Sequence, residues 1–256
     1  MSNPVKIIQQ DVLNLAKYSG NTKPRKSISA SMLDDDMLRI YFRVKFGIID
    51  NQTFTQDNTL GSIFQLGIDH LADERDTLEA RVRREIPYKD SGWILSAETD
   101  IIDYENKTIC DFKLTKEYTY KNFNQNHSYA WQVRLQDYIF RKTNLIKNDY
   151  KLYLYMLFKD IRQNESFLKP IEQIVEVEKY EDDVIEEKID EIIYVIESWL
   201  EDESKIEVCK DLWWRKSKNG NSYPSKCEKY CSYKSICKFY NSHSKTPVMK
   251  NEGLGW

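Results

Sequence analysis

The residues of this 256-residue chain whose types and spacing could do chemistry lie between positions 98 and 113. This stretch reads E-T-D-I-I-D-Y-E-N-K-T-I-C-D-F-K, and its apolar residues alternate on both sides of a polar cluster. Alternation with a period of two predicts two strands joined by a turn, which is a β-hairpin. A turn centred on Glu105 and Asn106 places Asp100 opposite Asp111.

Two carboxylates directly opposed on a hairpin repel each other, because their Cβ atoms lie only about 4.5–5.5 Å apart. A divalent cation held by Asp100 and Asp111 would offset this repulsion, and carboxylate oxygens are suitable ligands for it. Lys113 shares a face with Asp111, whereas Phe112 is expected to face a core. The hairpin is therefore a candidate metal site. The alternative is that both aspartates end strands in water, with Lys113 as a cross-strand ion-pair partner.

Length and composition restrict the class of protein. A chain of 256 residues can bury one sizeable core, which favours one main domain with appended elements. No stretch approaches the roughly 18 consecutive apolar residues of a membrane-spanning helix, and the N-terminus lacks a signal-peptide pattern. We therefore expect a cytoplasmic protein without a membrane partner. The formal charge is −3, so a basic surface that binds nucleic acid would have to be local.

Residues 210–238 are locally basic. Eight Lys or Arg residues are interleaved there with two tryptophans and three tyrosines, against two acidic residues. This composition is typical of surfaces that contact phosphates through cations and stack bases on aromatic rings. Trp213, Trp214 and Arg215 are therefore candidate nucleic-acid contacts. A solvated basic face with aromatic rings packed beneath it would have the same composition.

Three of the five cysteines, Cys227, Cys231 and Cys237, lie in the segment C-E-K-Y-C-S-Y-K-S-I-C. Close spacing in a terminal segment favours an iron–sulfur cluster or Zn²⁺ over a disulfide framework in a cytoplasmic chain. A fourth ligand is needed, and Cys209 and His243 are candidates. The same cysteines could instead be reduced and structural.

Apolar periodicity predicts the elements that must position these residues. Helices are expected at 31–47, 60–80, 124–142 and 181–203, and strands beside the hairpin at 150–160 and 167–177. Gly47 would stop the first helix, whereas Gly61 and Gly67 inside the second indicate close approach of a backbone or a ligand. In the third helix Gln132 and Gln136 lie one turn apart and share a face.

In their order, these motifs resemble the RecB-like branch of the PD-(D/E)XK nuclease superfamily, which includes CRISPR-associated and bacteriophage exonucleases. That branch has an S-x-S helix, a G-x-x-x-H helix, strands bearing G-x-x-D and D/E-x-K, a Q-x-x-x-Y helix and a terminal cysteine cluster. The matching segments are S-A-S-M-L from Ser29, G-S-I-F-Q from Gly61, A-E-T-D to Asp100, D-F-K from Asp111, Q-V-R-L-Q from Gln132 and the cysteines from Cys227. The resemblance spans most of the chain.

The resemblance implies an α/β fold with a restriction-endonuclease-like core, in which helices flank a central mixed sheet. The helical N-terminal part and the core would occupy residues 27–207, after a lead-in at 1–26 and before a basic, aromatic, cysteine-bearing tail at 208–256. The implied activity is hydrolysis of DNA phosphodiester bonds by an exonuclease in phage or bacterial recombination, repair or processing. Single- or double-stranded DNA would be the substrate, and a helicase or recombination protein a partner, in a bacterial or phage-infected cell.

The resemblance also assigns roles to individual residues. Asp100 and Asp111 would hold Mg²⁺ or Mn²⁺, helped by the Phe112 carbonyl oxygen. Lys113 would orient or deprotonate the attacking water, and Gln132 would hydrogen-bond the lysine or the substrate backbone. Oxygen ligands of this kind suit these hard cations and not zinc.

This chain departs from the pattern of the branch at two positions near the expected site. Gln65 stands where the branch carries a metal-binding histidine, so Gln65 would bind metal weakly, or Asp69 or His70 would take part. Gln136 stands at the tyrosine position with Tyr138 close by, and both are candidate contacts to nucleic acid.

A third departure concerns the tail. Iron–sulfur members of the branch place their first cysteine in the N-terminal helix, before a proline, where this chain reads Asp36-Met37. A cluster or zinc site would therefore need Cys209 or another ligand. The alternatives to a nuclease are a catalytically degenerate nucleic-acid-binding protein, and a metal-stabilised interaction module that docks a partner through the acidic helix at 181–203.

Overall fold

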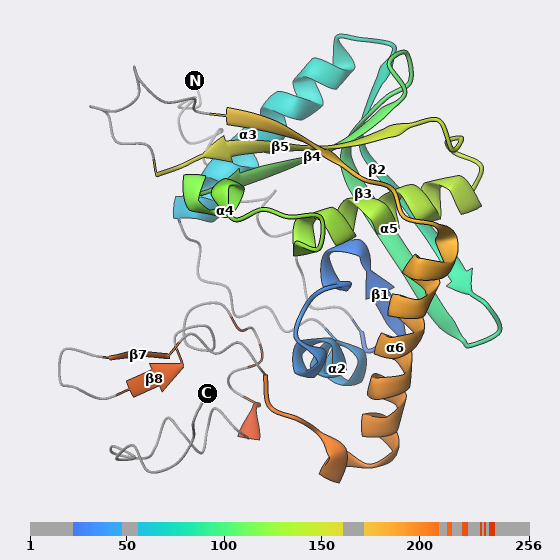
Figure 1. Ribbon diagram of the computed structural model, residues 1–256, viewed down its shortest axis with the longest axis vertical. Helices are drawn as coiled ribbons and strands as arrows, with labels where there is room; N and C mark the ends of the chain where they lie inside the picture. Colours follow the sequence, from blue (N-terminus) through green and yellow to red (C-terminus); the bar gives the residue numbers. More distant parts are fainter. Residues whose placement is uncertain are drawn as a thin grey trace, which may run out of the picture. The chain divides into compact units, whose positions relative to one another are not determined.

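The computed structural model describes residues 23–47, 56–160, 172–209, 214–216, 222–224, 231, 233 and 236–238. A mixed six-stranded sheet has the order β1-β3-β4-β5-β6, with β2 on the other edge of β3 (Figure 1). Its strands are β1 (Ser27–Ser29), β2 (Leu78–Tyr88), β3 (Trp93–Asp103), β4 (Thr108–Thr115), β5 (Lys151–Phe158) and β6 (Glu172–Val177). The expected α/β class, with a mixed sheet flanked by helices, is confirmed.

The remaining elements belong to two compact units. They are the helices α2 (Met37–Phe46), α3 (Gln56–Asp73), α4 (Glu117–Lys121), α5 (Ser128–Lys142) and α6 (Asp182–Glu201), the 3₁₀ turns η1 (Ala30–Met32) and η2 (Glu203–Lys205), and the hairpin strands β7 (Trp214–Lys216) and β8 (Ser222–Pro224). The larger unit contains Lys26–Asp35 and Phe54–Tyr194, and therefore the whole sheet. The smaller unit contains Asp36–Thr53 and the chain from Val195 onward.

The expected hairpin is confirmed as β3 and β4. The two strands are antiparallel and pair Ile101 with Cys110, the register in which Asp100 stands opposite Asp111. Asp103 closes the turn, because its Oδ1 accepts two backbone hydrogen bonds at 3.0 and 2.9 Å. Local alternation and turn chemistry therefore predicted this element correctly.

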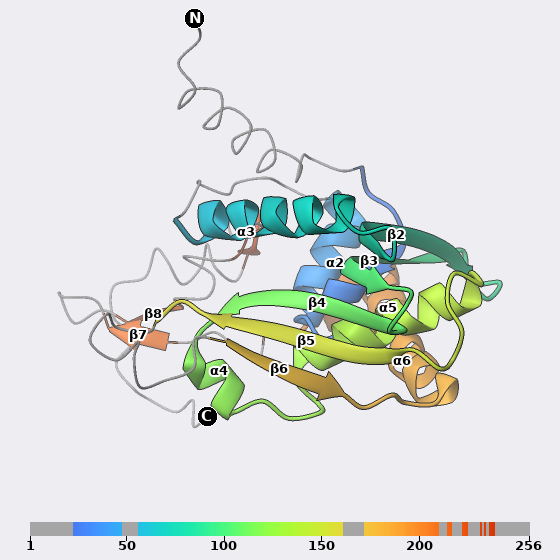
Figure 2. The ribbon, with the colours of Figure 1, turned by 90° about the horizontal axis from the view of Figure 1, so that it is seen from above.

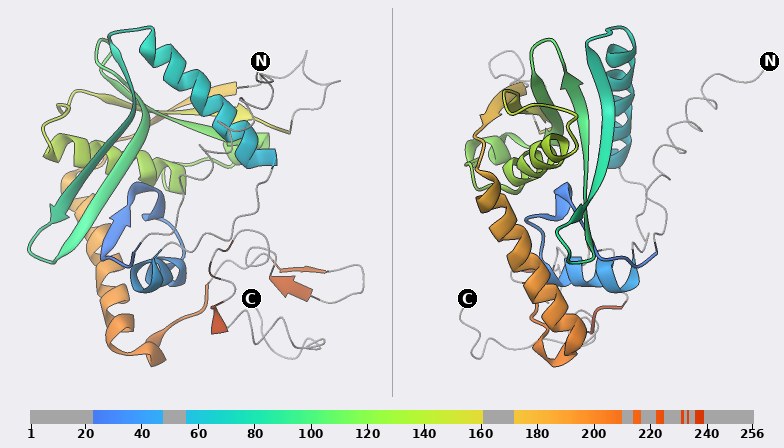
Figure 3. Two further views of the ribbon diagram at one scale, coloured as in Figure 1. Left: turned by 180° about the vertical axis from the view of Figure 1, so that it is seen from behind. Right: turned by 90° about the vertical axis from the view of Figure 1, so that its right-hand side faces the viewer.

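Different helices cover the two faces of the sheet, with α3 on one side and α5 on the other (Figures 2 and 3). On β4 the more deeply buried face is that of Ile109 and Asp111, toward α5. Phe112 is half-buried on the other face, where its ring centroid lies 5.6 Å from that of Phe64 in α3. Phe112 was expected to face a core; it packs against α3 but is only half-buried, and α5 buries the carboxylate side more deeply.

The sequence predicts neither β1 nor β2. The second expected helix runs to residue 80, whereas α3 ends at Asp73 and residues 78–88 form a strand paired with β3 along its length. The first expected helix begins only at Met37, after the separate turn η1. Gly47 ends α2 as expected, with φ 78° and ψ −170°, a conformation that is nearly restricted to glycine.

Several longer elements match their predictions. The structure contains α5, α6 and β5 within the expected ranges, and β6 is an edge strand as expected. At Gly61 and Gly67 an added Cβ would meet no heavy atom of the described residues within 4 Å, so no described backbone approaches these glycines closely. None of the described helices is long and apolar enough to cross a membrane.

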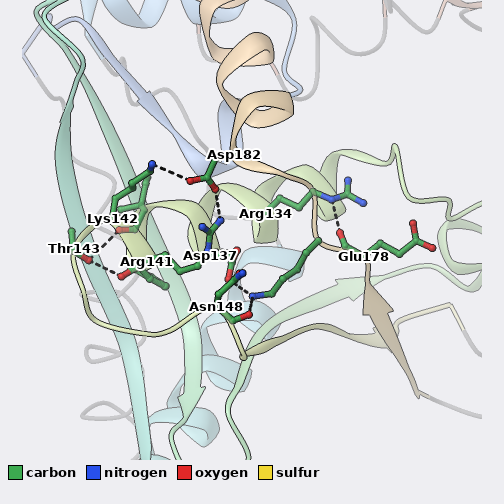
Figure 4. A network of polar contacts seen from close by, with 11 residues as sticks. Arg134, Asp137, Arg141, Lys142, Thr143, Asn148, Glu178 and Asp182 are labelled. Atoms are coloured by element: carbon green, nitrogen blue, oxygen red, sulfur yellow. Dashed lines mark hydrogen bonds and ion pairs between the residues drawn. The ribbon is translucent and has the colours of Figure 1, made fainter.

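A buried arginine anchors α5, the helix that carries both candidate glutamines (Figure 4). Arg134 is fully buried, and its guanidinium donates to the carbonyl oxygens of Glu178 and Gln125 at 2.8 and 2.5 Å. It also stacks on the ring of Tyr180, with its carbon 3.6 Å from the ring centroid. These bonds attach α5 to the segment that precedes it and to the connection between β6 and α6.

An ionic network continues this anchoring along α5 (Figure 4). The buried carboxylate of Asp137 pairs with Arg141 and with Lys179, each at 2.9 Å. Arg141 and Lys142 then pair with Asp182 in the first turn of α6, at 2.8 and 2.9 Å. Because α5 is held in this way, the side chains that it turns toward the sheet are held as well.

Candidate active site

The candidate site lies where the sheet opens along one edge of β3. On that edge β1 pairs with residues 94–96 and β4 with residues 101–103, so between them residues 97–100 pair with neither strand. The carbonyl oxygen of Glu98 instead accepts a hydrogen bond from Gln136 Nε2 at 2.7 Å. A side chain of α5 thus fills the gap, and Asp100 and Asp111 stand at its end.

Asp100 bridges the two diverging strands. Its Oδ2 accepts a hydrogen bond from the backbone N–H of Phe112 at 2.7 Å. Because the N–H and C=O of one strand residue point to the same edge, the Phe112 carbonyl also faces this gap. Burial, and next the charge of Asp111, raise the pKa of Asp100 to about 7. The two carboxylates therefore resist being ionised together.

Asp111 is 2% exposed, and its two carboxylate oxygens have different partners. Its Oδ1 accepts hydrogen bonds from Gln132 Nε2 at 3.0 Å and from Gln136 Nε2 at 2.8 Å. Its Oδ2 lies against the ammonium of Lys113 as an ion pair, but it accepts no hydrogen bond of regular geometry from any residue that the structure describes. A buried carboxylate oxygen that accepts no hydrogen bond keeps its lone pairs available to bind a cation.

Lys113 is held by three neighbours. Its Nζ donates to Gln132 Oε1 at 2.9 Å, pairs with Asp111, and lies 5.1 Å from the ring centroid of Tyr129. Burial by itself would lower the pKa of Lys113, but the negative charges of Asp111 and Asp100 leave it raised. Without a bound cation, the folded protein therefore favours the ammonium form of Lys113, which can donate hydrogen bonds.

The structure thus brings together Asp100, Asp111, Lys113 and Gln132, the four residues expected at the reaction centre. Gln136 also belongs to this group, but not as the expected contact to nucleic acid. It is fully buried beneath Asp111 and presents no surface to a ligand. Tyr138 is 4% exposed and donates its hydroxyl to Glu186 of α6 at 2.9 Å, so it also presents no ring to a ligand.

Gln65 and its neighbours do not join this group. The Gln65 amide donates to Asp69 Oδ1 at 3.2 Å, and Asp69 pairs with Arg81. His70 is largely exposed and faces Glu74 at 3.3 Å. Among the contacts of the described residues, none of the three candidates for the histidine position reaches either aspartate of the hairpin.

The tail is only partly described. Trp213 and Cys227 lie outside the described residues, and for Trp214 and Arg215 the structure describes only the backbone of β7, paired with β8. The positions of the other cysteines are described: Cys237 is buried, and Cys209 and Cys231 are half-buried. Within the part of the chain that is described, no three His, Cys, Asp or Glu side chains come together as a metal site. Metal binding by the tail stays a prediction.

The fold matches that of a solved protein. The crystal structure of SSO0001 superposes with a TM-score of 0.58, covering 90% of this chain and 96% of that chain at 16% identity. Identity this low shows a shared fold and nothing more. A phage-related exonuclease from Haemophilus somnus 129PT gives a TM-score of 0.43 over 70% of this chain and 94% of that chain, at 13% identity, which is too weak to support a conclusion. No protein-family model and no curated protein matches the chain.

Two residues near the site were not singled out from the sequence. Tyr129, whose ring lies beneath Lys113, precedes Gln132 by three residues and so shares its helical face. The charge of Glu98 adds to the raised pKa of Asp100, on whose strand it lies two positions earlier. Helical and strand periodicity, applied outward from Gln132 and Asp100, would have found both.

Proposed function

We propose that this chain is a metal-dependent nuclease with a PD-(D/E)XK core that hydrolyses DNA phosphodiester bonds. One observation carries the proposal: Asp100 and Asp111 meet at the fork between β3 and β4, with the buried Asp111 Oδ2 beside Lys113. A cation bound between two buried carboxylates would reduce their mutual repulsion and so stabilise the fold. The fold shared with SSO0001 supports the arrangement of the sheet and carries no information on activity.

The donors at the fork fit Mg²⁺ or Mn²⁺. Mg²⁺ is commonly bound by one or two carboxylates, with waters and substrate phosphates completing its shell, and not by a cage made of protein alone. Asp111 Oδ2, the Asp100 carboxylate and the Phe112 carbonyl would hold the ion. Once bound, it would act as a Lewis acid on the scissile phosphate and lower the pKa of a coordinated water.

The other side chains have roles that follow from their contacts. Lys113, which Gln132 holds in place, would donate to a phosphate oxygen on which negative charge develops. Gln132 donates to Asp111 and accepts from Lys113, so it fixes the position of the ammonium group relative to the carboxylate. Gln136 supports Asp111 from beneath.

The finer parts of the proposal rest on the sequence resemblance. We infer exonuclease action on single- or double-stranded DNA, in phage or bacterial recombination, repair or processing. A helicase or recombination protein would be the partner. The acidic surface of α6 and the tail are the places to look for such a contact.

The test is a cleavage assay with end-labelled single- and double-stranded DNA in Mg²⁺, Mn²⁺ or EDTA. We expect wild-type cleavage with either cation and none in EDTA, and no cleavage by Asp111→Ala or Lys113→Ala. The matched controls are Asp149→Ala and Lys107→Ala, which break an exposed ion pair away from the site and should cleave normally. Circular dichroism would confirm that all four variants fold.

Cleavage that persists in both site variants would overturn the assignment. DNA binding without cleavage by the wild type would support the degenerate binding protein instead. If the protein neither binds nor cleaves DNA, the interaction module becomes the better description. The length and labelled end of the products also report polarity and the need for a DNA end.

A further inference from the structure

Arg81 has a backbone conformation that residues other than glycine rarely adopt. Its φ is 51°, in the left-handed region, although it lies inside the strand β2. The pairing of β2 with β3 is interrupted there, since Ala80 pairs with Ile101 and Val82 with Thr99. Arg81 therefore stands opposite Asp100, the candidate metal ligand.

In a regular strand, the Arg81 side chain would share a face with Asp100. Side chains of paired residues lie on the same face, and successive residues alternate. By its register Asp100 lies on the same face of the sheet as Asp111, the face that α5 covers. Regular alternation would therefore turn Arg81 away from α3, toward the side of the Asp100 carboxylate.

The structure shows the opposite orientation. Arg81 reaches α3 and forms two parallel contacts with Asp69, from Nε to Oδ1 at 3.0 Å and from Nη2 to Oδ2 at 2.8 Å. Gln65 supports the same carboxylate, because its Nε2 donates to Asp69 Oδ1 at 3.2 Å. Bidentate pairing of this kind fixes the direction of a guanidinium as well as its position.

We propose that Asp69, braced by Gln65, holds Arg81 away from Asp100 and so keeps that carboxylate available to a divalent cation. This inference rests on the proposed metal site. An arginine beside Asp100 would add a second positive charge to that of Lys113, and would compete with the cation for the two carboxylates. The unfavourable φ of Arg81 is the conformation that turns the side chain to α3, and strain of this kind persists where surrounding contacts enforce it.

Asp69 and Arg81 are on this account positioning residues, and Gln65 has a use that does not require it to bind metal. The segment G-S-I-F-Q-L-G-I-D carries Gln65 and Asp69 one turn apart on α3, so both project toward β2. The glutamine that stands at position 65 in place of histidine thus orients the Asp69 carboxylate through its amide.

The test measures Mn²⁺ and Mg²⁺ affinity by titration calorimetry without DNA, so that it does not depend on cleavage. Asp69→Ala releases Arg81, and we expect the affinity to fall about tenfold, the effect of a one-unit electrostatic shift. Adding Arg81→Gly to this variant removes the competing cation and should restore wild-type affinity; glycine also accepts a positive φ. Asp149→Ala makes the same change in charge at an exposed ion pair and should bind normally.

The outcomes separate the two proposals. A wild-type protein that binds neither cation would overturn the metal site and this inference together. If the wild type binds but Asp69→Ala binds equally well, or if Arg81→Gly fails to rescue the loss, only the role of Asp69 and Arg81 is refuted. Should Asp69→Ala not fold, Gln65→Ala replaces it, with an expected loss of about twofold from the missing brace, again rescued by Arg81→Gly.

Discussion

Gln136 donates a hydrogen bond of 2.8 Å from Nε2 to Oδ1 of Asp111, and both side chains are almost wholly buried. Gln132, one turn earlier on α5, donates to the same oxygen at 3.0 Å. Two amides on one oxygen determine the orientation of the carboxylate and leave its Oδ2 to Lys113 and to any cation. The candidate site thus depends on a residue that is itself fully buried.

Replacing Gln136 with leucine should therefore damage both stability and activity. Loss of the amide removes one donor from the Glu98 carbonyl and one from the buried Asp111 carboxylate, which we expect to cost about 1–3 kcal/mol of unfolding free energy. The Asp111 carboxylate would also lose its orientation, and cleavage should fall about 100-fold. Urea unfolding and initial cleavage rates measure the two effects.

Tyr138→Phe is the matched control on the same helix. It removes a buried hydrogen bond to Glu186 and leaves the Asp111 contacts intact. We expect a loss of about 1 kcal/mol in stability with normal cleavage. Equal activity losses in both variants would mean that general damage to α5, and not orientation of Asp111, is responsible.

Asp100→Asn should stabilise the metal-free protein at neutral and alkaline pH. The folded state raises the Asp100 pKa from 3.8 to about 7, so it holds the proton more tightly than the unfolded state does. The stability contributed by this group is greatest below pH 4 and is lost as the pH rises toward 7. Asparagine mimics the protonated carboxyl, and we expect a gain of roughly 1–3 kcal/mol at pH 8.

Thermal unfolding of both proteins in EDTA, at pH 5 and pH 8, measures this difference. The advantage of Asp100→Asn should be larger at pH 8 than at pH 5. Added Mn²⁺ should then stabilise the wild type and not the variant, because a ligand that binds the folded state raises its stability. An advantage that does not change with pH would show that the Asp100 carboxylate is not the source.

Arg134→Lys should destabilise the larger unit by about 2–4 kcal/mol, although the charge is conserved. Lysine cannot reproduce the three donated hydrogen bonds or the stacking on Tyr180. Arg83→Lys is the control, because Arg83 is 60% exposed and forms an ion pair with Glu85 on the same strand. Urea unfolding of the two variants compares them, and equal stability would contradict the anchoring role of Arg134.

For the tail we propose an iron–sulfur cluster or Zn²⁺ bound by Cys227, Cys231 and Cys237, with Cys209 as a candidate fourth ligand. Protein purified without oxygen should contain iron or zinc at one site per chain by elemental analysis. Cys231→Ser should lower that content, whereas Cys110→Ser in β4 should not. Absence of both metals from the anaerobic protein would make the tail cysteines structural.

Local patterns explain which predictions were correct. The β3–β4 hairpin needs only alternation and a turn closed by Asp103, both of which lie within a short stretch of sequence. The amphipathic periods of α5 and α6 are equally local. β2 was missed because its charged residues do not identify a strand until β3 pairs with it.

By itself the sequence determined the hairpin, the register that sets Asp100 opposite Asp111, and the helix with Gln132 and Gln136 on one face. Only the tertiary structure decided which amides reach Asp111, because that depends on α5, and not α3, covering the carboxylate face. It also decided that Arg81 turns to Asp69, since the backbone angle of one residue reverses the side to which its guanidinium projects. Both are consequences of packing between segments distant in sequence, which no local pattern records.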